Sequence, residues 1–188
     1  MKILILIISL FYFKVANSDP ITYIIDSGHT YPSFTIDHFK LSKTIGFFED
    51  TTGQVVIDWA KKEGNVSIVI NTSSINTGHR KRDEHLRNPD FFDVENYPFI
   101  KFNSNKLIFS DGSLIKIIGK LEILGKTNNI TLNVDNVNCI DNHPIKKVKA
   151  CGASMSSLLN RSEFGMTKYI PAISDEVNLN IQVEILKE

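Results

Sequence analysis

Apolar and polar residues alternate with a period of two along most of this chain, which is the pattern of strands that bury one face. In the clearest case, residues 176–186, every second side chain is apolar: Val177, Leu179, Ile181, Val183 and Ile185. Similar stretches, bounded by Gly, Asn, Asp and Pro, recur roughly every ten residues. They predict strands over 22–26, 31–39, 44–50, 53–60, 65–71, 99–110, 114–125, 129–137, 148–159 and 176–186.

Helical spacing is scarce, and the sequence predicts one short helix between Gly78 and Asn88. Thr77 is a suitable N-terminal cap, because its hydroxyl can accept from a backbone N–H of the first turn. Arg87 lies in the last turn, where a cation is favoured, and Pro89 ends the helix. We therefore expect about two helical turns.

The number of strands limits the architecture. At least eight strands, each with one apolar face, form either two packed sheets or one sheet closed on itself. A closed barrel removes the exposed edges that an open sheet has to protect. Gly46, Gly119, Gly125 and Gly152 lie inside or at the ends of strands, where glycine permits the bulges and coiling that closure requires. The chain is therefore expected to be all-β, with a barrel as the favoured form.

The amino-terminal 18 residues have the composition of a secretory signal peptide. Lys2 precedes an apolar run over 3–13, and Ala16 and Ser18 provide the small residues of a cleavage site after Ser18. The run is shorter than the roughly 20 residues that a membrane-spanning helix needs. An exported, soluble chain of residues 19–188 is predicted, which suits one domain. An uncleaved membrane anchor is the alternative.

The charge balance argues against nucleic acid as a partner. Removal of Lys2 and Lys14 leaves 19 basic against 21 acidic side chains, a formal charge of −2. Phosphate contacts require a clustered excess of Lys and Arg, which this balance does not provide.

The chain has two cysteines, Cys139 and Cys151, and an exported protein matures where disulfides persist. Their spacing suits two antiparallel strands joined by a polar turn over 141–144, so we expect them to pair. Two free, buried thiols are the alternative.

No residue pattern indicates catalysis, a metal or a cofactor. The histidines are scattered, and His79 and His85 are not at the i, i+4 spacing that places two zinc ligands on one helix face. Asp83 and Asp90 could in principle flank a sugar as acid and base, but acidic residues beside arginine are more often ion-paired. The sequence contains no P-loop, G-x-S-x-G or C-x-x-C motif.

Five motifs resemble the YceI-like family of bacterial exported proteins: SINTG (74–78), RDEHL (82–86), DFFD (90–93), YPFIKF (97–102) and RSEFG (161–165). The resemblance spans about residues 22–187. It implies an extended, lipocalin-like, eight-stranded antiparallel barrel with one short helix at the barrel mouth. It further implies a periplasmic protein that binds long amphiphilic chains, such as polyisoprenoids, in the barrel.

The expected function is therefore a periplasmic carrier or sensor of a polyisoprenoid, an isoprenoid quinone or a fatty-acid-like lipid. No catalytic group is needed for this role. A structural or partner-binding barrel with a lumen filled by side chains is the main alternative, and an unrecognised hydrolase is a further one. Transient contact with a membrane or a membrane cytochrome and formation of a homodimer stay open.

A charged run over 77–90 precedes an aromatic one, and this suggests a site for both ends of an amphiphile. Arg82, with His85 beside it, is predicted to meet a head group at the barrel mouth, with Arg80 and Arg87 as further donors. In the alternative, Arg82 pairs with one of the nearby aspartates, Asp83, Asp90 or Asp93, and pins the helix to the rim.

Strand parity gives the expected wall of the lipid pocket. We predict the following inward side chains: Phe34, Ile36, Phe48, Val55, Ile57, Trp59, Phe91, Phe92, Ile100, Phe102, Ile117, Leu121 and Ile123, with Phe164 as a plug and Gly165 in a permissive backbone conformation. A single bulge would exchange the inner and outer sets. The small residues of 151–157, with Gly119 and Gly125, either leave space in the lumen or let strands pack closely.

Overall fold

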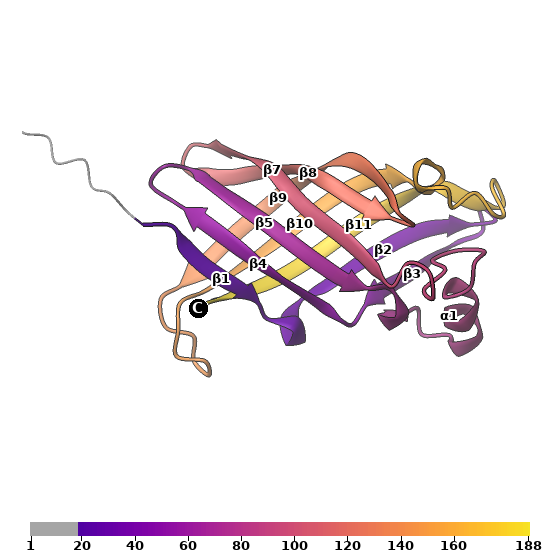
Figure 1. Cartoon of the computed structure of the whole chain (residues 1–188), viewed down its shortest axis with the longest axis horizontal. Coiled ribbons are helices and arrows are strands. Elements are labelled where there is room, and N and C mark those ends of the chain that lie inside the picture. Colours follow the sequence, from indigo (N-terminus) through magenta and orange to yellow (C-terminus); the bar gives the residue numbers. More distant parts are fainter. Residues whose placement is uncertain (1–18) are drawn as a thin grey trace, which may run out of the picture.

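The structure is a computed structural model that describes residues 19–188, so the predicted signal peptide lies outside the described residues. Most of the chain is strand (Figure 1). The strands are β1 Ile21–Ile25, β2 Tyr31–His38, β3 Ser42–Phe48, β4 Thr51–Asp58, β5 Glu63–Asn71, β6 Ile75–Asn76, β7 Phe99–Ser110, β8 Ser113–Ile123, β9 Lys126–Ile140, β10 Ala150–Asn160 and β11 Ile173–Lys187. Each predicted strand has its counterpart, whereas the two-residue β6 was not predicted.

The sheet closes into an eight-stranded antiparallel barrel. Its strands follow one another around the ring in the order β1, β4, β5, β7, β8, β9, β10 and β11, and pairing of β1 with β11 completes the ring. The strands β2, β3 and β6 continue the sheet from the other half of β11. The predicted all-β barrel is therefore confirmed.

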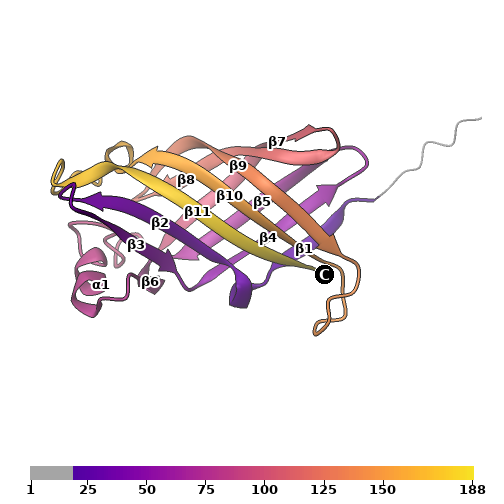
Figure 2. The same cartoon turned by 180° about the vertical axis from the view of Figure 1, so that it is seen from behind.

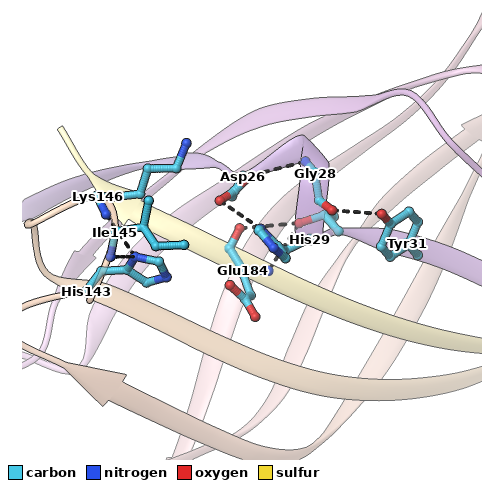
Figure 3. A network of polar contacts seen from close by, with 9 residues as sticks. Asp26, Gly28, His29, Tyr31, His143, Ile145, Lys146 and Glu184 are labelled. Atoms are coloured by element: carbon cyan, nitrogen blue, oxygen red, sulfur yellow. Dashed lines mark hydrogen bonds and ion pairs between the residues drawn. The ribbon is translucent and has the colours of Figure 1, made fainter.

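The long β11 is shared by two strands, because β1 pairs with its last residues and β2 with its earlier part. Between β1 and β2 lies the 3-10 turn η1 (Ser27–His29). Asp26 closes this turn, since its carboxylate accepts from the N–H of Gly28 at 3.1 Å and lies 3.1 Å from Nδ1 of His29 (Figure 3). Its own N–H donates to the carbonyl of Glu184 on β11 at 2.9 Å. These bonds hold the break between β1 and β2 against β11.

The carboxyl group of Asp26 is held in its charged form at this break. Burial alone would raise its pKa, but the hydrogen bonds from His29 and Gly28 and the charge of Lys146 outweigh burial and lower the pKa. Asp26, His29 and Glu184 each place a carboxylate oxygen or an imidazole nitrogen within 4.8 Å of those of the other two. Their spacing along the chain does not reveal this grouping. We interpret it as the polar link between β1, β2 and β11.

The predicted helix is α1, Arg80–Leu86, and it lies at the end of the barrel where β2 turns into β3 (Figures 1 and 2). Its cap is His79, whose side chain accepts from the N–H of Arg82, and not Thr77 as predicted. The reason is local: Gly78 adopts a positive φ of 73°, so the helix begins later than the sequence suggests. The N–H and hydroxyl of Thr77 instead donate to the carboxylate of Asp83. Within residues 19–188, no helix is long and apolar enough to cross a membrane.

The predicted disulfide is confirmed. Cys139 on β9 and Cys151 on β10 lie directly opposite each other in the antiparallel register and are bonded. The bond closes the loop over 141–149 between these strands.

Replacement of both cysteines with serine is expected to lower the free energy of unfolding by about 3 kcal/mol, because a closed loop of this length restricts the unfolded chain. Urea denaturation of the wild type and of the double variant measures the difference. The reductant dithiothreitol serves as the internal control, since it should destabilise the wild type and leave the variant unchanged. Equal stability of both proteins would contradict the prediction.

Candidate functional site

The barrel encloses a cavity of about 630 Å³, and its wall is almost entirely apolar. The wall includes Trp59, which directly follows β4, and Leu114 at the start of β8, and it also includes residues of α1. The turn after β4 and the helix α1 lie at opposite ends of the barrel (Figure 1). Cavities of roughly 300–1,000 Å³ are typical of small-molecule sites. The described side chains therefore do not fill the barrel, which counts against the alternative of a filled lumen.

All sixteen predicted site residues line this cavity: Phe34, Ile36, Phe48, Val55, Ile57, Trp59, Arg82, His85, Phe91, Phe92, Ile100, Phe102, Ile117, Leu121, Ile123 and Phe164. Their contact with a ligand remains a prediction. The wall residues that were not predicted include Val66, Ile68 and Ile70 of β5, Ile130, Leu132 and Val134 of β9, and the alternate residues Val177 to Ile185 of β11. The same period of two would have found them.

Glycine does not open the lumen at Gly119. A Cβ built on this residue would lie 2.6 Å from the ring of Phe102, so the missing side chain lets that ring lie flat against β8. Gly152 and Ala153 of β10, in contrast, line the cavity. Gly152 and Ala153 therefore provide lumen space, whereas Gly119 serves close packing.

The cavity reaches solvent at the α1 end. Phe39, Arg82 and Tyr169 are the exposed members of its described lining. Phe39 directly follows β2, Arg82 lies on α1, and Tyr169 precedes β11. The end of β2, the helix α1 and the segment before β11 lie at the same end of the barrel (Figure 2), so the exposed part of the cavity lining is at this end.

Arg82 at this opening is held by Thr77. Its Nε donates to the hydroxyl of Thr77 at 2.7 Å, and its Nη2 donates to the carbonyl at 2.9 Å. Among the described residues no ion pair joins Arg82 to Asp83, Asp90 or Asp93, so this part of the alternative is wrong. The bonds to Thr77 nevertheless fasten Arg82 to the segment that precedes α1. Nη1 has no hydrogen-bond partner among the residues of 19–188 and can donate to an anionic head group.

A different arginine fastens the helix segment to the rim. Arg87 donates to the carbonyls of Ser73 and Ile75, at 2.7 and 2.9 Å. Arg80 lies 3.6 Å from Glu84 in an exposed ion pair and is absent from the cavity wall. The expectation that Arg80 and Arg87 also serve as head-group donors is therefore not supported by their positions.

His85 belongs to a polar network around Asp90. Asp90 accepts from or pairs with His85 at 3.0 Å, Lys168 at 3.2 Å and the hydroxyl of Tyr169 at 3.3 Å. The contacts with His85 and Lys168 lower the pKa of Asp90. A general acid in glycoside hydrolysis needs a raised pKa, which Asp90 does not have. Asp83 is buried, and its carboxylate accepts a hydrogen bond from the N–H of Thr77. This geometry does not favour a hydrolase.

The segment after β10 closes the same end of the barrel. The 3-10 turn η3 (Arg161–Phe164) buries Phe164 against the core, with 2% of its surface exposed. Gly165 follows with a φ of 88°, which is the permissive backbone conformation expected for this glycine.

One wall residue carries an unsatisfied polar atom. Thr51 is 1% exposed and lines the cavity, and its hydroxyl has no hydrogen-bond partner among the described residues. A buried hydroxyl without a partner costs about 1–3 kcal/mol. The oxygen itself is inaccessible, so this cost falls on the stability of the barrel.

The variant Thr51→Val is expected to stabilise the ligand-free barrel by about 1 kcal/mol, because valine has nearly the same shape without the unsatisfied hydroxyl. Urea denaturation of delipidated protein measures this. The matched control is Thr52→Val, an exposed position on the same strand, which should change stability little. A loss of stability in Thr51→Val alone would show that the hydroxyl is satisfied in solution.

A family model described as YceI-like domain matches residues 23–185. The chain belongs to this family. Protein YceI of Escherichia coli O157:H7 is 31% identical over 157 residues, which cover 83% of this chain and 81% of that protein. The resemblance seen in the sequence motifs is thereby confirmed.

Two solved structures show the fold of this YceI-like chain. BcnA of Burkholderia cenocepacia matches with a TM-score of 0.72 at 24% identity, covering 85% of this chain and 98% of that one. A polyisoprenoid binding domain from Saccharophagus degradans, implicated in plant cell wall breakdown, matches with a TM-score of 0.67 at 14% identity, covering 89% and 99%. At such identities the likeness concerns the fold.

Proposed function

We propose that this YceI-like protein binds one long-chain amphiphile, with the tail in the barrel and the head group beside Arg82. The ligand class is a polyisoprenoid, an isoprenoid quinone or a fatty-acid-like lipid. The observation that carries the proposal is an apolar cavity of about 630 Å³ whose exposed lining lies at one end. Arg82 lies in this exposed lining, and only its Nε and Nη2 donate to described residues. The protein acts as a carrier or sensor and needs no catalytic group.

The energetics support tail binding. Burial of each methylene contributes about 0.8 kcal/mol, so a few isoprene units suffice for roughly micromolar affinity after the costs of association. The name of the Saccharophagus degradans domain, which describes polyisoprenoid binding, agrees with this ligand class.

The proposed place of action is the periplasm, after export by the signal peptide expected in residues 1–18. The disulfide between Cys139 and Cys151 supports an oxidising compartment, because such bonds persist there and are rare in the cytosol.

Mass spectrometry of an organic extract tests the function. The protein is purified from a bacterial periplasm without detergent and extracted, and a copurifying long-chain amphiphile at near-stoichiometric amount is expected. The same extract of an unrelated periplasmic protein controls for adsorbed lipid. A folded protein that yields no amphiphile and binds neither added polyprenol nor added fatty acid would refute the proposal.

The variant Arg82→Met tests the head-group contact. Affinity for a long-chain fatty acid is expected to fall about tenfold, since a charge-assisted hydrogen bond is lost, whereas affinity for the corresponding alcohol changes little. Fluorescence displacement measures both. Arg80→Met, which removes an equal charge from the same helix outside the cavity wall, is the control. An equal loss of affinity for the fatty acid and for the alcohol would show that Arg82 does not bind the head group.

A further inference from the structure

Four apolar side chains stand exposed around the cavity opening, and we call them the rim patch: Phe39, Leu41, Tyr169 and Ile170. Leu41 is the most exposed large apolar residue of residues 19–188, at 87%. Leu41 and Ile170 are not part of the cavity wall. Exposed apolar clusters of this kind mark an interaction surface.

The rim patch is continuous, although it comes from two distant parts of the chain. Phe39 and Leu41 form the turn between β2 and β3, and the N–H of Phe39 donates to the carbonyl of Ala172 at 2.7 Å. This bond places the turn beside the segment that carries Tyr169 and Ile170. Because Phe39 and Tyr169 also line the cavity, the rim patch borders its opening directly.

The charges next to the rim patch are mainly basic. Lys40 lies within the turn and Lys43 follows it, and Lys81 is exposed on α1. Asp37 lies opposite Lys43 in the β2–β3 register. Two further acidic groups are paired, Asp90 with Lys168 and Glu84 on α1 with Arg80. Apolar tips surrounded by lysines suit an anionic lipid surface, where the apolar groups enter the interface and the cations meet the head groups.

We propose that the rim patch docks the open end of the barrel onto the surface of an anionic lipid membrane. The inference rests on the proposed function, because an amphiphile with a long tail is poorly soluble and has to pass between bilayer and barrel. With the opening set against the lipid surface, the tail moves from one apolar environment to the other. Leu41 and Ile170 then insert into the interface, and Lys40 and Lys43 select for anionic head groups.

Co-flotation with lipid vesicles tests the docking. Wild type is expected to float with vesicles that contain phosphatidylglycerol, more weakly with pure phosphatidylcholine, and less in high salt. The double variant Leu41→Ser/Ile170→Ser should partition at least tenfold less, and Lys40→Glu/Lys43→Glu should lose the preference for phosphatidylglycerol. The control is Ile145→Ser, which removes a similarly exposed residue (78%) from the loop over 141–149 at the other end of the barrel.

A binding assay without vesicles separates this inference from the proposed function. The Leu41→Ser/Ile170→Ser protein should bind a fluorescent fatty acid in solution as the wild type does, but should take it up more slowly from vesicles. If wild type floats with vesicles yet binds no amphiphile, the proposed function fails alone. Docking is overturned if the wild type does not float with vesicles, or if Leu41→Ser/Ile170→Ser floats as the wild type does. It is also overturned if Ile145→Ser floats as little as the double variant is expected to. Self-association in ultracentrifugation that the double variant abolishes would assign the rim patch to a second copy and overturn docking too.

Discussion

The variant Ala153→Phe is expected to lose binding of long-chain amphiphiles while the barrel stays folded. Ala153 lies on β10, lines the cavity, and is paired across the sheet with Val137 and Val183. A phenyl ring in place of its methyl group points into space that the ligand tail would occupy. The ring fills an existing cavity, so the cost of overpacking, about 1–3 kcal/mol in a filled core, should be small.

The position of Ala153 turns this into a test of tail depth. It lies near the start of β10, at the end of the barrel opposite α1 (Figure 1). Long tails that reach this level lose several buried methylenes at about 0.8 kcal/mol each, which corresponds to at least a hundredfold weaker binding. Short-chain fatty acids, which end before this level, should bind almost as in the wild type.

A displacement titration with a series of fatty acids of increasing length measures the effect, and thermal unfolding checks the fold. The matched control is Ser154→Phe, whose side chain follows on the same strand but is absent from the cavity wall. The tail does not reach Ala153 if Ala153→Phe weakens all chain lengths equally, or none of them.

The cavity wall could be predicted from the sequence because inward and outward positions alternate along each strand, which is a local property. The pattern within one strand was enough to predict the inward positions Val55 and Ile57 on β4, and Ile100 and Phe102 on β7. Between the predicted strands, Gly, Asn and Asp marked the turns, and this fixed the number of strands. The family resemblance implied a ring of eight antiparallel strands, but the order of the strands around the ring could not be derived from alternation.

Parity failed where the pairing of two strands becomes irregular. Extending the alternation of β8 back from Ile117 would place Ile115 inside, yet Ile115 is exposed and Leu114 is buried and lines the cavity. The register between β7 and β8 shifts between Ile108 and Phe109, opposite these residues. Such a shift depends on both strands together, so a single strand's pattern does not reveal it.

The polar partners were harder to predict than the apolar wall. Arg82 has three aspartates close to it in sequence, but Gly78 turns the chain so that Thr77 receives its hydrogen bonds. The unsatisfied hydroxyl of Thr51 is another case, because only the closed barrel decides which groups surround a threonine. These contacts depend on loop conformations and on distant segments, which local patterns do not encode.

The variant Arg161→Ala is expected to cause the largest loss of stability of any single substitution proposed for this protein, about 3–5 kcal/mol. Arg161 is 4% exposed, and its guanidinium donates to four backbone carbonyls. The acceptors are Met166 at 2.8 Å, Lys168 at 2.9 Å, Ile173 at 3.0 Å and Ser174 at 2.8 Å. Burial lowers the pKa of Arg161, while the charge of Asp175 opposes that shift, so the guanidinium stays a cation inside the barrel end.

Alanine at position 161 would leave these carbonyls without a donor in a place that water reaches poorly, which explains the large expected loss. The midpoint of thermal unfolding should fall by roughly ten degrees. Lysine at the same position should recover only part of the loss, because one ammonium group cannot reproduce the planar set of donors. Arg80→Ala, an exposed arginine with the same charge change, is the control and should shift the midpoint little.

Because the four carbonyls belong to the segment that carries Tyr169, Arg161→Ala should also disturb the cavity opening, and tryptic cleavage after Lys168 should become faster than in Arg80→Ala. Equal cleavage rates would mean that the segment keeps its conformation without the guanidinium.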